Sequence, residues 1–179
     1  MTLFNLRTVR LRPSERYERR LPVQLEPFAL GGERYEPAPE DPEARFSISR
    51  ATTGSLFGLA FEVALIGPCV RCLDEASVRL AVDATEYQAT NPESEEVRTP
   101  YVVDDRLDLS AWARDAVALA LPEKLLCRED CAGLCAGCGA NLNEEECRCA
   151  PAAPDPRFAK LAELRDRLTA VERADSGGG

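Results

Sequence analysis

The middle of the chain alternates hydrophobic and polar residues most clearly. Residues 55–66 carry an apolar side chain at every second position (Phe57, Leu59, Phe61, Val63 and Leu65), and residues 77–87 repeat the pattern (Val78, Leu80, Val82 and Ala84). A period of two predicts strands with one buried face. Residues 67–72 join the two strands, so the sequence predicts a hairpin with Cys69 and Cys72 at its tip.

Shorter elements are expected on either side of this hairpin. Residues 46–51 predict a third strand, and residues 3–30, which are interrupted by prolines, predict one or two short edge strands. The acidic, proline-containing residues 31–42 and 91–100 predict loops. Residues 101–103 then predict another short strand.

Two helices are predicted after the strands. Residues 110–121 have Ser110 as the expected N-cap and Pro122 as the stop, with an apolar stripe at helical spacing (Trp112, Ala116, Val117, Leu119, Ala120 and Leu121). This helix would deliver Cys127 and Cys131 to a fixed place. A second helix, residues 155–171, is expected to pack back on the sheet, and residues 172–179 are expected to be a disordered tail.

These elements predict an α+β fold: a small antiparallel β-sheet, one or two helices and a cysteine-rich zinc-binding segment. A chain of 179 residues is long enough for one ordinary hydrophobic core. We therefore expect residues 1–126 to form a mainly β domain that includes the helix, and residues 127–149 to form the zinc-binding segment.

The eight cysteines carry the most specific signal. Two form the Cys-x2-Cys pair of the hairpin and six lie within residues 127–149; all are candidate metal ligands (Cys69, Cys72, Cys127, Cys131, Cys135, Cys138, Cys147 and Cys149). Zinc takes four thiolates at about 2.3 Å in closed structural sites. Eight cysteines are therefore enough for two zinc ions.

The spacing favours a division into two sites. Cys135, Cys138, Cys147 and Cys149 form a Cys-x2-Cys-x8-Cys-x-Cys pattern that needs only one short loop. The hairpin pair would then join Cys127 and Cys131, which links elements more than fifty residues apart. The alternative is one site made of Cys69, Cys72 and two downstream cysteines, with the others free.

Disulfides and free buried thiols are the competing explanations for the cysteines. Disulfides need an oxidising compartment, and residues 1–20 lack the apolar core and the cleavage site of a signal peptide. The most apolar run, residues 56–67, is too short to span a bilayer. We therefore expect a cytoplasmic protein without membrane contact whose thiols hold zinc.

Charge is distributed unevenly along the chain. The net charge is −9, but residues 1–25 carry +4 and residues 26–154 carry −13. An acidic body disfavours extensive nucleic-acid binding, since that affinity comes mainly from neutralised phosphates. Local RNA contact through Arg16, Arg19 and Arg20 remains open. The acidic surface would suit a basic partner, or would simply aid solubility.

The available chemistry argues against an enzyme. The chain has no histidine, which removes the usual general base and the usual ligand of hydrolytic zinc. It also has no phosphate-binding glycine loop, so no small-molecule substrate is expected. Arg71, Arg128 and Arg148 lie beside cysteines, where they either offset the thiolate charge or contact RNA phosphate.

Three segments carry a resemblance to a known family: CVRCLDEA, LPEKLLCREDCAGLCAGCGANLNEEECRC and DPRFAKLAELRDRL. Together they resemble the YceD-like family, the large ribosomal RNA subunit accumulation proteins, from about residue 56 to residue 168. The resemblance implies a non-catalytic factor in ribosome biogenesis, with large-subunit ribosomal RNA or a basic ribosomal protein as partner. A redox-responsive zinc protein is the alternative, and a zinc hydrolase is a third interpretation.

Overall fold

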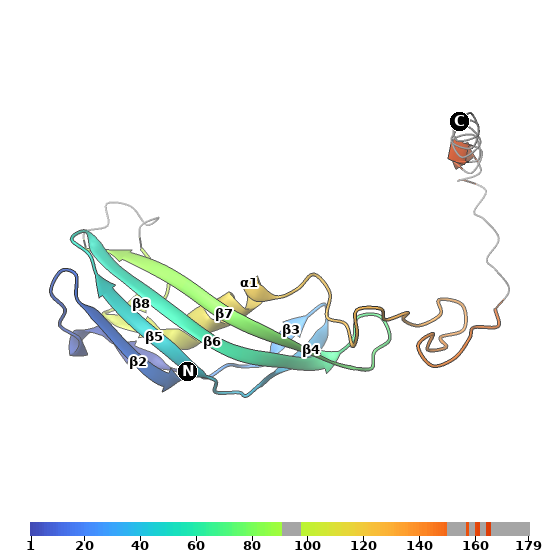
Figure 1. The fold of residues 1–179 in the computed structure, drawn as a ribbon, viewed down its shortest axis with the longest axis horizontal. Coiled ribbons are helices and arrows are strands. Elements are labelled where there is room, and N and C mark those ends of the chain that lie inside the picture. Colours follow the sequence, from blue (N-terminus) through green and yellow to red (C-terminus); the bar gives the residue numbers. More distant parts are fainter. Residues whose placement is uncertain (91–97, 150–156, 158–159, 162–163, 166–179) are drawn as a thin grey trace, which may run out of the picture.

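The fold is built around one long strand, β6 (Gly54–Pro68). In the computed structural model β6 pairs along its whole length with the antiparallel β7 (Glu75–Ala89). Its other edge pairs with β5 (Glu43–Arg50) over the first half and with β4 (Glu33–Ala38) near the end. The structure describes residues 1–90, 98–149, 157, 160–161 and 164–165, and Figure 1 shows β6 and β7 running the length of its body.

Short strands complete two sheets. β2 (Arg16–Pro22) extends the large sheet beyond β5, and β3 (Phe28–Leu30) extends it beyond β4. A small sheet has the order β1-β9-β8, from β1 (Leu3–Asn5), β9 (Arg106–Asp108) and β8 (Val102–Val103), with a 3-10 turn at Leu6–Thr8. All pairings are antiparallel.

The core lies between one face of the large sheet and the helix α1 (Leu109–Ala120). The predicted alternation of β6 is confirmed, because its five alternating apolar side chains are all buried; in β7, Leu80 and Val82 are buried, whereas Val78 and Ala84 are half-buried. From α1, Trp112, Ala113, Ala116 and Val117 pack against this face. The sheet therefore shares a single core with the helix.

The predicted N-cap and two positions of the predicted apolar stripe were wrong. Asp108 is the N-cap, since its Oδ1 accepts a hydrogen bond from the Ala111 N–H at 3.0 Å. Ser110 instead lies inside the helix, where its Oγ accepts from the Thr2 N–H. Leu119 is 89% exposed and Ala120 is also exposed, so neither belongs to the buried stripe, whereas Leu121 is partly buried against the core.

The described structure is dominated by sheet, which corrects the expectation of a small sheet in an α+β fold. Residues 31–42 were predicted to be a loop but contain β4, in which Tyr35 and Pro37 are buried.

Most of the predicted helix 155–171 and the tail 172–179 lie outside the described residues. Residues 160, 161, 164 and 165 are helical, and the packing of this segment stays a prediction. No helix among the described residues has the length and apolarity needed to cross a membrane.

Candidate metal centres

The first candidate centre, the hairpin tetrad (Cys69, Cys72, Cys127 and Cys131), lies where the β6–β7 hairpin meets the segment after α1. All four sulfurs lie within 4.8 Å of one another. The Sγ atoms of Cys69 and Cys131 are 3.8 Å apart, and those of Cys72 and Cys127 are 3.5 Å apart. Three of the four side chains are buried, so this centre is a small core of its own.

Backbone hydrogen bonds shape the hairpin tip that carries the first two cysteines. The Cys69 N–H donates to the Asp74 carbonyl at 2.7 Å, and the Leu73 N–H donates to the Cys69 carbonyl at 3.0 Å. Leu73 has φ +66°, a left-handed conformation that closes the turn. The Val70 N–H donates to the Leu125 carbonyl at 3.0 Å, which ties the tip to the chain that follows α1.

The second candidate centre, the loop tetrad (Cys135, Cys138, Cys147 and Cys149), is local in sequence. Its sulfurs also lie within 4.8 Å of one another, with 3.2 Å from Cys135 to Cys147 and 3.7 Å from Cys138 to Cys147. Gly139, at φ +75°, turns the chain after Cys138. Cys138 and Cys149 are exposed, so this centre is much more open to solvent than the hairpin tetrad.

N–H groups point at sulfur in both centres. The backbone N–H of Arg71 donates to Cys69 Sγ and that of Gly137 to Cys135 Sγ, each at 3.4 Å. Burial raises the pKa of Cys69, but backbone hydrogen bonds outweigh it and lower the pKa to about 6. Hydrogen bonding by the Cys147 thiol, aided by backbone N–H groups, lowers the pKa of Cys135 to about 6 as well. Each centre thus contains a thiol whose thiolate, the form that binds metal, is stabilised by hydrogen bonds.

The neighbouring thiols show the opposite tendency. Burial raises the pKa of Cys72 and of Cys127. The Cys147 thiol is the main cause that raises the pKa of Cys149 to about 12. Four thiolates crowded together repel one another, so full deprotonation of either tetrad needs a cation among the sulfurs.

Both tetrads fit a tetrahedral thiolate-bound metal ion. Four sulfurs at about 2.3 Å from a zinc ion would be separated by about 3.8 Å. Four of the sulfur pairs are 3.2–3.8 Å apart, and every pair in each tetrad lies within 4.8 Å. A disulfide needs about 2.05 Å, and all eight cysteines are free. The structure thus groups the cysteines into the two sets that their spacing predicted.

The candidate RNA-contact arginines do not form one surface. Residues directly opposite in an antiparallel pair share a face, and Arg16 and Arg20 lie opposite Ser49 and Arg45 on the outer face of the sheet. Arg19 lies opposite the buried Phe46, on the other face. The alternation of Tyr17 and Leu21, both half-buried, is the sequence signal that separates Arg19 from its neighbours.

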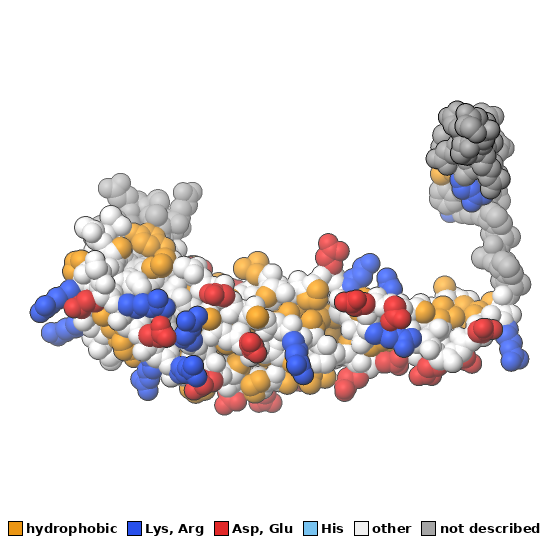
Figure 2. All heavy atoms as spheres, viewed as in Figure 1, with side chains coloured by type: hydrophobic (Ala, Val, Ile, Leu, Met, Phe, Trp, Pro, Cys, Tyr) orange, Lys and Arg blue, Asp and Glu red, His pale blue; other side chains and the backbone are white. Residues whose placement is uncertain are grey.

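The outer face carries both signs of charge. Arg16 pairs with Glu18 at 3.1 Å, and Arg20 pairs with Glu43 at 3.7 Å. Figure 2 shows basic and acidic side chains interspersed over the side of the molecule turned to the viewer. Arg45, which lies directly opposite Arg20, is a candidate that sequence reasoning missed, since the pairing of the two strands was not known.

Two of the arginines near the cysteines are engaged in the centres themselves. Arg71 Nη1 donates to the Cys131 carbonyl at 2.6 Å. Arg128 Nη2 donates to Asn143 Oδ1 at 2.8 Å, and its Nε lies 3.4 Å from Asp130. These contacts favour the charge-offsetting interpretation of Arg71 and Arg128.

A family model described as "Large ribosomal RNA subunit accumulation protein YceD" matches residues 58–165, more than half of the chain. The match covers β7, α1 and both tetrads. No solved structure gives a significant match.

Curated relatives share part of the chain. Uncharacterised proteins of Mycobacterium tuberculosis and Mycobacterium bovis are 40% identical over 104 residues, which cover 55% of this chain and 50% of each relative. The large ribosomal RNA subunit accumulation protein YCED homolog 1, chloroplastic, of Arabidopsis thaliana is 35% identical over 66 residues, which cover 37% of this chain and 21% of the relative. The matched part thus spans about half of the mycobacterial proteins and about a fifth of the plant protein.

Proposed function

We infer that this chain, which belongs to the YceD family of large ribosomal RNA subunit accumulation proteins, is a non-catalytic factor that supports accumulation of that RNA during ribosome biogenesis. The family match supports the process, and the Arabidopsis relative carries the same description. The inferred partner is large-subunit ribosomal RNA or a basic ribosomal protein. Its thiols suit a reducing compartment such as the cytoplasm, where disulfides are rare.

The observation that supports a metal-dependent role is the grouping of eight cysteines into two tetrads. In each tetrad all four sulfurs lie within 4.8 Å of one another. We assign one zinc ion to each, held by the hairpin tetrad and by the loop tetrad. A four-thiolate zinc is closed to water, so it supplies a cross-link instead of a Lewis acid. The hairpin tetrad would fix the β6–β7 tip to the chain after α1, and the loop tetrad would fold residues 135–149.

Depletion in the native organism tests the function. Cells that lose the protein should accumulate less large-subunit RNA and fewer free large subunits, while small subunits remain in excess. The parental gene should restore the balance, and a variant with Cys69→Ser and Cys72→Ser, which breaks the hairpin tetrad, should not. Normal subunit profiles after full depletion would remove the proposed role.

A redox-responsive zinc protein is the second candidate, and the exposure of Cys138 and Cys149 favours it. Oxidation of exposed zinc thiolates would release the ion and unfold the loop. The two candidates differ in one observation on cells. Mild peroxide should change large-subunit accumulation only if the loop tetrad acts as a switch.

A further inference from the structure

We infer that the two tetrads bind metal cooperatively, through a hydrogen bond from Asn143 to a sulfur of the hairpin tetrad. Asn143 lies between Cys138 and Cys147, on the loop whose ends belong to the loop tetrad. Its Nδ2 nevertheless donates to Cys131 Sγ, at 3.4 Å. This inference rests on the proposed metal binding and adds that one centre depends on the other.

The amide of Asn143 is held in one orientation. Its Oδ1 accepts from the Ala132 N–H at 2.7 Å and from Arg128 Nη2 at 2.8 Å. Both partners are donors only, so the amide oxygen must face them and the NH2 group must face the sulfur. The second Nδ2 hydrogen is used by Asn141 Oδ1 at 2.9 Å. These contacts orient the amide so that one of its N–H groups points at Cys131 Sγ.

The same loop contacts both halves of the hairpin tetrad. Asn141 Nδ2 donates to Asp74 Oδ2 at 3.0 Å, on the hairpin tip. The Leu142 N–H donates to the Gly133 carbonyl at 2.9 Å, and the Leu134 N–H donates to the Arg71 carbonyl at 3.1 Å. An ordered loop therefore braces the two chain segments that supply the four sulfurs of the hairpin tetrad.

Hydrogen bonds from N–H groups to the sulfurs should raise the affinity of the hairpin tetrad for its metal ion. Four thiolates around one divalent ion leave a formal charge of −2, and N–H donors to sulfur offset it. Outer-shell partners of this kind typically change metal affinity by about 10–100-fold. An ion in the loop tetrad fixes Cys138 and Cys147 and so orders the loop between them. The ordered loop holds Asn143 against Cys131, which favours metal binding by the hairpin tetrad. By linkage, an ion in the hairpin tetrad must raise the affinity of the loop tetrad by the same factor.

Zinc binding to full-length chains tests the coupling by chelator competition. Three chains are compared: the parental chain, a chain with Cys135→Ser and Cys138→Ser that keeps only the hairpin tetrad, and a chain with Cys69→Ser and Cys72→Ser that keeps only the loop tetrad. The product of the two parental binding constants should exceed the product of the two single-site constants by about 10–100-fold. The same set built on Asn143→Ala should lose most of this excess, whereas a set built on Asn5→Ala, in strand β1 of the small sheet, should keep it.

Asn143→Asp separates the donor from the loop anchor. The carboxylate keeps an acceptor for the Ala132 N–H and for Arg128 but removes the N–H to sulfur, so the excess should fall as in Asn143→Ala while the chain stays folded. In the cobalt-loaded protein the thiolate-to-cobalt band of the hairpin tetrad should also shift. If the product of the two parental binding constants equals the product of the two single-site constants, the coupling is overturned. If the excess is unchanged in both Asn143 variants, the role of Asn143 is overturned. Fewer than two zinc ions in the parental chain would overturn the proposed metal content and, with it, the coupling.

Discussion

Tyr35 and Gly67 pack so closely that the ring of Tyr35 occupies the space of any side chain at Gly67. A Cβ on Gly67 would overlap Tyr35 Cδ1 and would lie 2.9 Å from the Arg34 carbonyl. The Tyr35 hydroxyl donates to the Pro68 carbonyl at 2.8 Å, and Pro68 directly precedes Cys69. The buried tyrosine of β4 therefore supports the hairpin tip that carries half of the hairpin tetrad.

Gly67→Ala should destabilise the body and weaken zinc binding at the hairpin tetrad. Overpacking of this kind costs about 1–3 kcal/mol, measurable as a lower midpoint of denaturant unfolding. Tyr35→Phe, which removes only the hydroxyl, should cost about 0.5–1.5 kcal/mol. In a double-mutant cycle, Gly67→Ala should cost much less beside Tyr35→Ala, where the ring is gone. Purely additive costs would contradict the steric explanation.

The two tetrads should contribute unequally to stability. The purified protein should contain two zinc ions by elemental analysis, and Cys72→Ser or Cys149→Ser should each leave one. Cys72→Ser should lower the thermal midpoint of the body strongly, because the hairpin tetrad links segments distant in the chain. Cys149→Ser, the matched control, should lower it less. Equal shifts would show that the local loop also stabilises the sheet.

Mild hydrogen peroxide should release zinc in two steps. Exposed thiolates are oxidised first and condense to disulfides, so the loop tetrad, with its exposed Cys138 and Cys149, should lose its ion before the hairpin tetrad. A zinc-binding dye measures the release, and mass spectrometry after alkylation identifies the oxidised cysteines. Early oxidation of the buried Cys69 would reverse the expected order.

Alkaline pH should destabilise the protein through Tyr101. Burial raises the pKa of Tyr101 to about 12, and a 2.9 Å hydrogen bond to Asp115 adds to this effect. The folded state therefore keeps a proton that the unfolded state loses near pH 10, so stability falls as pH rises from about 10 to 12. Unfolding measured through this window should show a smaller loss in Tyr101→Phe. Identical slopes for the two proteins would assign the loss to other groups.

RNA binding, where it occurs, should depend on the outer face of the sheet. Replacing Arg16, Arg20 and Arg45 with Ala should weaken binding to large-subunit RNA fragments. The logarithm of the binding constant falls with the logarithm of the salt concentration, and this slope should become shallower by roughly one unit for each arginine that no longer neutralises a phosphate. Arg19→Ala, on the opposite face, is the matched control and should change little. An unchanged slope in the triple variant would favour association through a protein partner.

Sequence reasoning was most reliable where the physical signal was local. The alternation in residues 55–66 predicted β6, and the cysteine spacing predicted both tetrads. It failed where tertiary contacts decide. The prolines of residues 31–42 suggested a loop, yet Glu36, Pro37 and Ala38 pair with the end of β6. Asn143 was not singled out either, because only the folded loop brings it to Cys131.

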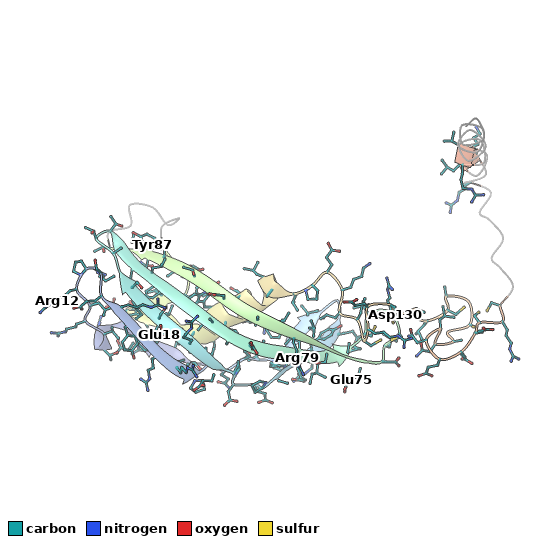
Figure 3. All side chains as sticks on the ribbon, in the orientation of Figure 1. Arg12, Glu18, Glu75, Arg79, Tyr87 and Asp130 are labelled. Carbon is teal, nitrogen blue, oxygen red and sulfur yellow. The ribbon has the colours of Figure 1, made fainter. Side chains whose placement is uncertain are left out.

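The unbroken pairing of β6 with β7 sets a fixed span across the molecule. Fourteen steps of about 3.3 Å give β6 a length of about 46 Å, and each residue from Gly54 to Pro68 is paired with a residue of β7. Figure 3 places Arg12 and Tyr87 at one end of this pair, and Glu75 and Asp130 at the other. The pair thus fixes a distance: a partner that contacts both the end near Arg12 and the end near Asp130 must present two contact points about 46 Å apart.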